Sequence, residues 1–405
     1  MANSILPFPS QRRLRPEHAD EVAAIVREAN ASHQSVEILG GGTKRSLGNP
    51  VSADAQLDVS AIQGIDLYEP EELIIKVRAG TPMSQIRAAL AEKRQHLAFD
   101  PPSYAAFFGD SEADDTIGGI VSCNLSGSRR ISTGSVRDAV LGIEGVNGLG
   151  EAFKGGGRTV KNVTGYDLPK LLTGSFGIFA IITSVTLKVQ PLPEQQVTLQ
   201  LTGLNDPKAI QVLADVLRLP LDISAAAHVA GRSSPPITAL RLEGFAASVA
   251  ARKQELDKHL RQFGDVTSID GDESAAFWRH QRDLSDFASD SQACLWRLLL
   301  PADHAARIVA TIGGEVLYEW GGSQTFVRAT EEKARREASA LRALVSEVGG
   351  SAGLFKAPIG LRRELGACHP PPKAYGVLLE RLRSSFDPND ILNPDKLAVA
   401  DSGAF

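Results

Sequence analysis

The feature that most constrains this chain is a run of three glycines that directly follows an apolar segment. Val36, Ile38 and Leu39 predict a buried strand, and the next residues are Gly40-Gly41-Gly42-Thr43-Lys44. Without side chains in the way, the backbone N–H groups of such a loop can converge on an anion. Glycine runs also form ordinary turns, so the loop by itself leaves both interpretations open. A second glycine-rich region, from Asp115 to Asp167, favours a phosphate-bearing ligand.

Bulk composition indicates a soluble globular protein of several domains. The chain has 405 residues, 43% of them hydrophobic and 22% charged, and a chain of this length exceeds one ordinary core. Its formal net charge is -5. Non-specific nucleic-acid binding usually requires a basic face, so we expect no nucleic-acid partner.

Nothing in the sequence indicates a metal site or a membrane-spanning segment. The three cysteines (Cys123, Cys294 and Cys368) are too far apart for zinc or iron–sulfur spacing, and the eight histidines form no H-x-H or H-E-x-x-H arrangement. Prolines near the N-terminus interrupt any signal-peptide core, and no apolar run reaches transmembrane length. We therefore expect no metal ligands and a cytoplasmic location.

Strand and helix alternate in the first part of the chain, which is typical of an α/β arrangement. The apolar spacing predicts a helix over 16–31 and strands over 36–39 and 73–77. Thr81 is placed to cap a helix over 82–94. Residues 117–188 are rich in glycine and β-branched side chains, and within them 178–189 is predicted to be a central strand.

Pro191 and Pro193 mark a boundary, and a second domain is predicted beyond it. Strands are expected over 197–201 and 239–245, and helices over 207–217, 248–263 and 331–348. This pattern fits an antiparallel sheet covered by helices on one face. We therefore predict an α+β protein with domains at 1–190 and 191–385 and a C-terminal segment at 386–405.

Two common nucleotide-binding motifs do not fit the glycine loop. A Rossmann loop requires G-x-G-x-x-G, but Gly40–Arg45 lacks the last glycine and Gly148–Phe153 fails at the same position. A Walker loop ends in Gly-Lys-Ser/Thr, whereas Lys44 here follows Thr43. The anion-binding interpretation therefore needs a different fold.

The loop Gly40–Lys44 after a strand, followed by Thr116–Gly119, resembles the PCMH-type FAD-binding domain of the vanillyl-alcohol oxidase family. Further blocks resemble the FAD-binding subunits of bacterial glycolate oxidases (glycolate dehydrogenases). These blocks are Leu125–Arg130, Arg137-Asp138, Lys161–Asp167, Gly174–Gly177, Leu295–Arg297, Glu319–Gly322 and Phe386-Asp387-Pro388…Asn393-Pro394. The resemblance spans about 14 to 397. It implies a two-subdomain PCMH-type FAD-binding domain, a cap domain of antiparallel sheet and helices, and a C-terminal segment that packs back on the FAD domain.

The resemblance also implies which residues contact FAD. Gly40, Gly41, Gly42, Thr43 and Lys44 would hold the pyrophosphate through backbone N–H groups, with Lys44 adding charge. Thr116, Ile117, Gly118 and Gly119 would approach the flavin, because glycine lets backbone lie against a ring edge. Asn124 and Ser126 would add flavin contacts, and Ile181 and Ile182 match the strand that passes the adenine and ribose.

Two details refine this expectation. Ala180 occupies a position that is commonly glycine in the family, which argues against close backbone approach there. Residues 40–48 contain no histidine, which covalent attachment of the flavin to this loop would require. Non-covalent FAD is therefore expected.

The sequence shows no convincing catalytic constellation. Relatives that oxidise D-2-hydroxy acids place histidines and arginines of the second domain over the flavin as base and carboxylate clamp, whereas 349–355 holds no histidine. Each catalytic candidate has a structural alternative. The candidates are Arg129 and Arg130 (carboxylate clamp or ion pair), His369 (base or surface residue), Tyr166 with Asp167 (proton-handling pair, or packing and helix cap), Glu319 (structural carboxylate), and Trp278 and Trp296 (cavity or core). The catalytic residues stay unassigned.

The resemblance implies an FAD-binding subunit of a multi-subunit glycolate (2-hydroxy acid) dehydrogenase that contributes flavin, structural support or both to electron transfer. Its partners would be a catalytic FAD subunit that oxidises the substrate and an iron–sulfur subunit. The complex would be cytoplasmic and peripheral to the inner face of the cell membrane. Two alternatives stay open: a self-sufficient FAD-dependent D-2-hydroxy-acid dehydrogenase acting on glycolate or D-lactate, and a scaffold subunit that has lost FAD.

Overall fold

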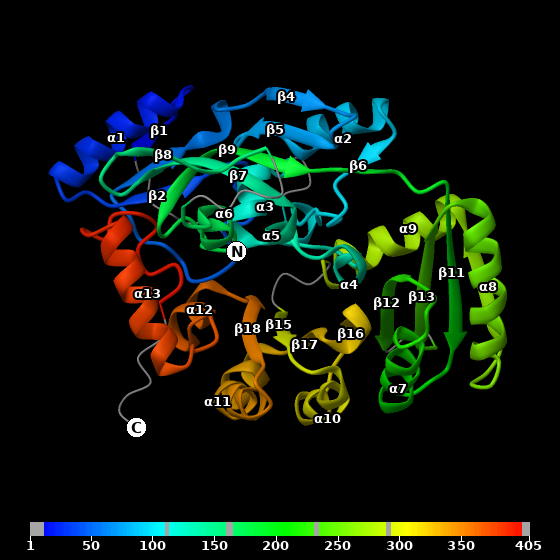
Figure 1. Ribbon diagram of the computed structural model, residues 1–405. Coiled ribbons are helices and arrows are strands. Elements are labelled where there is room, and N and C mark those ends of the chain that lie inside the picture. Colours follow the sequence, from blue (N-terminus) through cyan, green and yellow to red (C-terminus); the bar gives the residue numbers. More distant parts are fainter. Residues whose placement is uncertain (1–11, 110–112, 159–164, 231–234, 289–292, 399–405) are drawn as a thin grey trace. The chain divides into compact units, whose positions relative to one another are not determined.

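The computed structural model describes residues 12–109, 113–158, 165–230, 235–288 and 293–398, and the chain divides into two compact units (Figure 1). The first unit comprises 1–125, 135–191 and 370–405, and the second comprises 126–134 and 192–369. The middle portion of the first unit ends at Pro191, beside the boundary expected at 190. Two portions differ from expectation: 126–134 belongs to the second unit and 370–385 to the first. At the end of the stretch 370–386, the Gly148 backbone N–H donates to the carbonyl of Phe386 at 2.8 Å, and Val36 pairs with Leu392 in parallel.

The first unit contains a small parallel sheet and a larger antiparallel sheet. The small sheet has the order β1 (Arg12–Leu14), β3 (Ala55–Asp58), β2 (Val36–Leu39). The larger sheet has the order β4 (Ile65–Glu69), β5 (Ile74–Arg78), β9 (Ala180–Lys188), β7 (Val140–Asn147), β8 (Ala152–Gly156). Eight of the nine residues of β9 are buried, and β9 lies in the middle of the order. The predicted central strand is confirmed.

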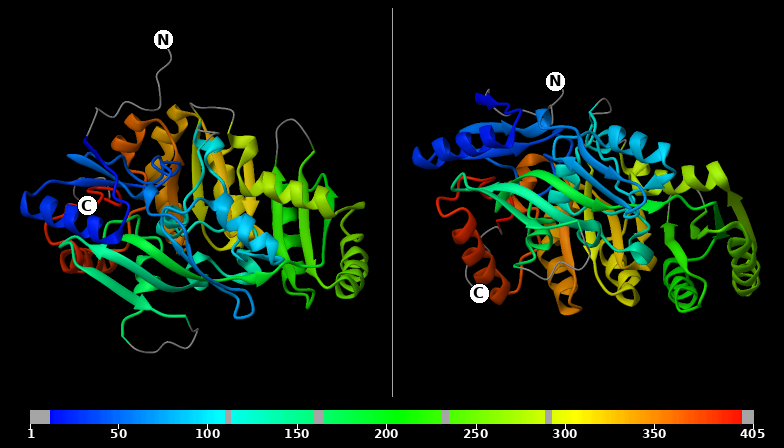
Figure 2. Two further views of the ribbon diagram at one scale, coloured as in Figure 1. Left: turned by 90° about the horizontal axis from the view of Figure 1, so that it is seen from above. Right: turned by 45° about the horizontal axis from the view of Figure 1, so that its top comes forward.

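Helices surround these sheets. They are α1 (Ala19–Ala31), α2 (Met83–Glu92), α3 (Ile117–Cys123), α5 (Val136–Ala139), α6 (Leu168–Leu172) and α13 (Lys373–Phe386), with 3-10 turns at Val59–Ala61 and Ala106–Phe108 and a short pairing of β6 (Gln95–His96) with β10 (Gln190–Pro191). Val22 and Val26 of α1 share a core with Val36 and Leu57 of the small sheet and with Ile181 of β9. Helix α1 is the blue helix beside the strands of the first unit in Figure 2. Both sheets therefore contribute to one hydrophobic core.

Local caps set where several of these helices begin. Asp167 caps α6 by accepting from the Lys170 backbone N–H, as predicted. Thr81 does not cap α2: its hydroxyl donates to the carbonyl of Arg78 at 2.7 Å and accepts from the Gly64 N–H at 2.9 Å. The hydroxyl stabilises the turn after β5 instead, so the prediction that Thr81 caps the helix is wrong.

The second unit is built on one eight-stranded sheet in which every pairing is antiparallel. Its order is β14 (Val266–Asp270), β11 (Gln195–Thr202), β13 (Ile237–Gly244), β12 (Ile223–Ala230), β16 (Val316–Glu319), β17 (Gln324–Ala329), β15 (Cys294–Leu299), β18 (Ser351–Lys356). Its helices are α4 (Arg130–Thr133), α7 (Asp206–Leu217), α8 (Ala246–Leu260), α9 (Gly271–Arg282), α10 (Ala302–Ile312), α11 (Glu331–Glu347) and α12 (Ile359–Leu365), with 3-10 turns at Ser285–Phe287 and Trp320–Gly322.

The two faces of this sheet are covered differently. Buried residues of α7, α8, α10 and α11 share the main core with one face (Figure 1). Helix α9 packs on the opposite face, where Trp278 lies against Ala225, Ala227 and Ala239. Its indole N–H donates to the hydroxyl of Thr198 at 2.7 Å. The expectation that helices cover a single face is therefore incomplete.

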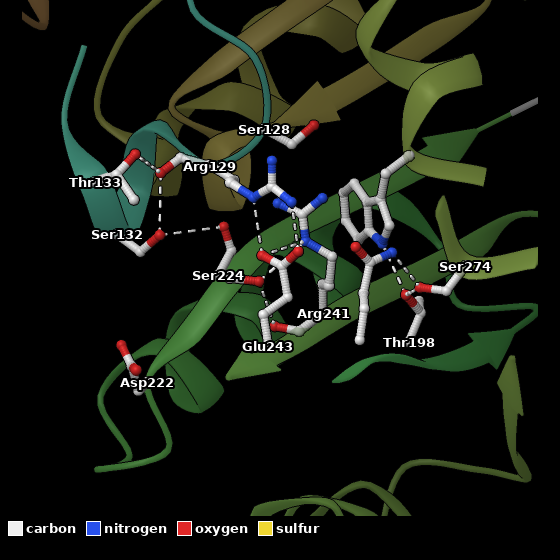
Figure 3. Close-up of polar contacts among 12 residues, drawn as sticks. Ser128, Arg129, Ser132, Thr133, Thr198, Asp222, Ser224, Arg241, Glu243 and Ser274 are labelled. Carbon is white, nitrogen blue, oxygen red and sulfur yellow. Dashed lines mark hydrogen bonds and ion pairs between the residues drawn. The ribbon is translucent and has the colours of Figure 1, made fainter. Parts of the chain in front are cut away.

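The segment 126–134 is bound to the second unit by charged and polar contacts (Figure 3). The Arg129 guanidinium holds the Glu243 carboxylate through two bonds of 3.0 and 2.6 Å, and Arg241 lies 3.2 Å from the same carboxylate. Trp320 Nε1 donates to the carbonyl of Gly127 at 3.0 Å. Burial raises the pKa of Glu243, but the two arginines outweigh it and lower that pKa to about 2.

None of the helices in the described part of the chain has the length and apolarity that a bilayer crossing requires.

Replacing Glu243 by glutamine should destabilise the protein, because the buried Arg241 and the half-buried Arg129 lose their shared carboxylate. We expect a loss of about 3 kcal/mol in the free energy of unfolding near neutral pH. The folded pKa lies below the usual value of 4.5, so the stabilisation is present above that value and is lost as the pH falls toward 2. Denaturant unfolding of Glu243→Gln should therefore show a smaller deficit at about pH 3.

Glu255→Gln serves as the control, because Glu255 is an exposed glutamate on α8. It should unfold like the unmodified chain at both pH values. A Glu243→Gln deficit that does not change with pH would contradict the ion-pair argument.

Candidate cofactor site

The glycine loop, helix α3 and the C-terminal segment line one cavity in the first unit. It encloses about 780 Å³ of space, a volume that includes open solvent at its mouth. Loop 40–45 lies at the end of β2, and Thr116 and Gly119 lie at the start of α3. Phe176, Asn393 and Lys396 complete other parts of the wall.

Most of the residues predicted to contact FAD lie on this cavity. Those that line it are Gly40, Gly41, Gly42, Thr43, Lys44, Thr116, Gly118, Gly119 and Ile182, together with Ala180. The other predicted residues lie elsewhere. Ile117 is fully buried in α3, Asn124 is the left-handed residue that ends α3, and Ile181 belongs to the core beneath α1. Ser126 belongs to the second unit.

The glycines of the loop are required for two different reasons. A Cβ on Gly40 would lie 2.4 Å from Thr116 Oγ1, and one on Gly41 would lie 2.2 Å from the carbonyl oxygen of Asp114. These two glycines let the loop pack on the 114–116 segment of the protein itself. Gly42 has a φ of +76° and nothing within 4 Å of the place a Cβ would take. Its missing side chain leaves open space at the cavity wall.

The loop also offers backbone donors. Among the described residues, no acceptor contacts the backbone N–H of Gly41, Gly42 or Thr43, while Arg45 N–H closes a turn onto the Gly42 carbonyl at 3.1 Å. Unsatisfied N–H groups at a polar cavity are costly unless water or a ligand accepts from them. Consecutive donors of this kind form the concave anion sites known as nests.

The positive charges of the loop are paired with buried carboxylates. Lys44 forms an ion pair with Asp115, and the hydroxyl of Thr43 donates to the same carboxylate. Burial raises the pKa of Asp115, but Lys44 and Thr43 outweigh it and hold that pKa below its usual value. Arg45 forms an ion pair with Glu37 in the same way, and Nε of Arg45 lies 2.6 Å from Oε1 of Glu37. Lys44 therefore brings no excess charge, contrary to the role expected for it.

The cavity wall also contains residues that sequence reasoning did not assign to the cofactor, among them Cys123, Asn393 and Lys396. Burial raises the pKa of the Cys123 thiol to about 11, so the thiol is neutral at physiological pH. Asn393 and Lys396 come from the far end of the chain. The Phe386–Pro394 block was recognised as part of the resemblance, but nothing in its local pattern indicates that it reaches the glycine loop.

Most catalytic candidates of the second unit have structural roles. Arg129 is bound to Glu243, and Arg130 lies 4.5 Å from the ring centre of Trp320. His369 Nε2 lies 3.1 Å from the hydroxyl of Ser346 on α11, and burial lowers the pKa of its ring. Trp278 and Trp296 are buried in cores, as the structural alternative predicted.

Two further candidates are Tyr166 in the first unit and Glu319 in the second unit. Tyr166 does not pack: it is 91% exposed, so that expectation is wrong. Glu319 is buried and accepts from the hydroxyl of Ser128 at 2.9 Å, which is the structural role expected. Residues 161–164, which precede Tyr166 in the Lys161–Asp167 block, lie outside the described residues.

A buried polar group of the second unit was not anticipated. His228 and Tyr318 are fully buried, and both approach Asp206 at the start of α7, at 3.4 and 2.7 Å. His228 Nδ1 also lies 2.9 Å from the hydroxyl of Thr238. These contacts tie α7 to the sheet. Nothing in the spacing of the three residues along the sequence could have revealed them.

Comparison with known proteins agrees with this cavity. Residues 10–156 match the family described as FAD binding domain. The chain is 32% identical over 373 residues to glycolate oxidase subunit GlcE of Escherichia coli (strain K12), covering 92% of this chain and 95% of that protein. It is 29% identical over 205 residues to glycolate oxidase subunit GlcD of Bacillus subtilis (strain 168), covering 50% of this chain and 42% of that one.

The fold agrees as well. A crystal structure of p-cresol methylhydroxylase superposes with a TM-score of 0.71 at 14% sequence identity, covering 97% of this chain and 90% of that one. This likeness confirms the predicted α+β architecture of PCMH type. With near-complete coverage of one relative at 32% identity, the chain belongs to the family of FAD-binding oxidoreductase proteins that includes glycolate oxidase subunit GlcE.

Proposed function

We propose that this chain is an FAD-carrying subunit of a glycolate oxidase complex, in which a partner flavoprotein oxidises glycolate and an iron–sulfur subunit carries the electrons onward. The observation that carries the proposal is the cavity at the glycine loop, in a chain similar to GlcE over nearly its whole length. The proposed location is the cytoplasm, with the complex at the inner face of the cell membrane.

The cavity residues fit FAD as follows. The backbone N–H groups of Gly41, Gly42 and Thr43 would donate hydrogen bonds to the pyrophosphate oxygens, and the open space at Gly42 would admit these oxygens. Paired charges at Lys44 and Arg45 keep the loop rigid and its donors aligned. Bound FAD supplies an acceptor that takes an electron pair and releases electrons singly.

We assign substrate oxidation to the partner because the three basic candidates of this chain already have contacts within it. A hydroxy-acid oxidase needs a base for the hydroxyl proton and a cationic clamp for the carboxylate. Arg129 is held by Glu243 and Arg130 by Trp320, and His369 contacts Ser346. The intact cavity argues against the flavin-free scaffold, because the open Gly42 site serves no packing within the chain.

Gly42 offers a direct test of the cofactor site. Gly42→Asp should place a carboxylate against the pyrophosphate, and Gly42→Asn should present the same shape without the charge. Both residues tolerate a positive φ. We expect the aspartate variant to bind FAD at least about tenfold more weakly than the asparagine variant in fluorescence titrations of the flavin-depleted chain.

Position 41 is unsuitable for this comparison, because any side chain there would meet the Asp114 carbonyl. Equal affinities of the two Gly42 variants would show that FAD does not bring its charge to this loop.

An experiment on the isolated chain tests whether this chain or the partner flavoprotein oxidises the substrate. Purified alone and loaded with FAD, it should keep the oxidised flavin spectrum when glycolate or D-lactate is added without oxygen. Adding the partner flavoprotein should restore glycolate oxidation. Bleaching of the flavin in the isolated chain would instead support the self-sufficient dehydrogenase, and a chain that never binds flavin would support the scaffold.

His369 provides a test of the unassigned base. His369→Ala should leave the turnover of the assembled complex within about threefold of normal, because its ring contacts Ser346 in the second unit. A loss of about a hundredfold or more would mark His369 as a base. Ser346→Ala serves as the matched control, since it removes the same contact without touching the ring.

A further inference from the structure

A second cavity lies on the large antiparallel sheet of the first unit. It encloses about 350 Å³ of space, a volume that includes open solvent. Strands β5, β9, β7 and β8, which are neighbours in that order, supply most of its lining (Figure 1). Among the described residues, this cavity and the cofactor cavity have no lining residue in common. The proposed function therefore leaves the second cavity unexplained.

Strand pairing brings the polar side chains of this cavity to one face of the sheet. Residues paired directly across antiparallel strands share a face. Glu144 of β7 pairs with Lys154 of β8 and with Ser184 of β9. Thr186 of β9 pairs with Lys76 of β5. Because Ser184 and Thr186 are two positions apart on one strand, all five side chains lie on the same face.

The charged side chains of the cavity carry more positive than negative charge. Those in the lining are Lys76, Lys154, Arg158 and Glu144. The ammonium groups of Lys76 and Lys154 lie 2.9 and 3.4 Å from the same oxygen, Oε1 of Glu144. The Arg158 guanidinium lies 3.6 Å from a carboxylate oxygen of Glu69. Three basic side chains thus share two carboxylates, which leaves an excess of one positive charge.

Glu144 shows that this place already stabilises a negative charge. Burial raises the pKa of Glu144, but the contacts with Lys76 and Lys154 outweigh burial and hold that pKa below its usual value. Glu144 is therefore ionised at neutral pH. One carboxylate balances only one of its two lysines, so the second ammonium would attract a further anion beside Glu144.

Small side chains leave room for such an anion. Gly142, Ser184 and Thr186 lie in the lining with the basic residues. A Cβ on Gly142 would lie 2.9 Å from the carbonyl oxygen of Gly157, so position 142 has no space for a side chain. Ser184 and Thr186 are buried and end in hydroxyl groups. This part of the lining is therefore polar and carries no long side chain.

A second run of three glycines brings Arg158 to the cavity. The run is Lys154-Gly155-Gly156-Gly157-Arg158, in which β8 ends at Gly156. Gly156 has a φ of +72°, and a Cβ there would lie 2.2 Å from the carbonyl oxygen of Leu141. The Gly157 N–H donates to the same carbonyl at 3.1 Å. The chain after β8 therefore stays close to β7, and both basic residues that flank the glycines line one cavity.

We propose that this cavity binds a phosphate group, carried by a small soluble molecule or by a lipid headgroup. Lysine binds phosphate as a point charge, and arginine presents a fork of donors that fits phosphate oxygens. Lys76, Lys154 and Arg158 can each meet a separate phosphate oxygen, whereas a carboxylate offers only two oxygens. The site is independent of the proposed function, since FAD is assigned to a different cavity.

Calorimetric titration of the full-length chain with inorganic phosphate tests the site. FAD is loaded first, so that the glycine loop cannot take up the added phosphate, and chloride keeps the ionic strength constant. Lys154→Gln should weaken phosphate binding about fivefold or more, because one attracting charge is removed. Lys154→Arg keeps the charge and should stay within about twofold of the unmodified chain.

Two further variants control for the charge of the whole sheet. Lys188→Gln removes the same charge from β9 at an exposed position outside the lining, and it should leave phosphate affinity unchanged. Glu144→Gln should tighten phosphate binding about threefold or more, because the competing carboxylate loses its charge. The Lys154 side chain is 67% exposed, so its replacement should spare the fold. Arg158→Gln, at a side chain 61% exposed, takes its place if Lys154→Gln does not fold.

Vesicles separate the two sources of the phosphate group. Cosedimentation with phosphatidylglycerol vesicles that is lost in Lys154→Gln, without a calorimetric signal from inorganic phosphate, would identify a lipid headgroup. A calorimetric signal that is lost in Lys154→Gln would identify a soluble phosphate.

Three results would overturn the inference. They are binding of neither probe, equal phosphate affinity of Lys154→Gln and the unmodified chain, and an equal loss of affinity in Lys188→Gln, which would reflect net charge alone. Failure of the proposed function would look different. A chain without FAD would take up phosphate at two sites, and Lys154→Gln would remove only the site on the sheet.

Discussion

The first unit depends on the contact between the glycine loop and the segment that enters α3. Gly40 and Gly41 approach Thr116 and the Asp114 carbonyl more closely than any side chain would allow. The buried Lys44–Asp115 ion pair holds the two segments together. Because the loop ends β2 and Thr116 starts α3, this contact joins the small parallel sheet to the helix across the cavity. A side chain at either glycine would separate the two walls.

In both units, carboxylates removed from water are paired with basic side chains. Glu243 lies between Arg129 and Arg241, Asp115 is bound by Lys44, and Glu37 by Arg45. Each carboxylate removed from water keeps a cation and hydrogen bonds, which limits the cost of burial. Basic residues that look available for substrate in the sequence are therefore parts of the structure. This arrangement is one basis for our proposal that a partner, and not this chain, oxidises glycolate.

Several elements could be predicted because their signals are local. The long β-branched run of β9 predicted a central strand, and Asp167 before Pro169 predicted a helix cap. Strand β12 was not predicted, and alanines such as Ala225 and Ala227 favour helices over strands. Their small size becomes meaningful only where Trp278 of α9 packs on them. Tyr166 is a large aromatic residue of the kind that usually packs, and only the tertiary structure shows that its side chain is 91% exposed.

The sequence by itself determined the α+β architecture, the resemblance to a PCMH-type FAD-binding family and the two glycine-rich segments of the cofactor site. Each depends on residues close together in the chain. The tertiary structure alone decided which charges are balanced and which parts of the chain complete the cavity. Lys396 lies more than 350 positions from Gly42, and Lys44 is matched by Asp115, 71 positions away. Pairing over such separations follows from how the chain folds back on itself, and local sequence patterns carry no record of it.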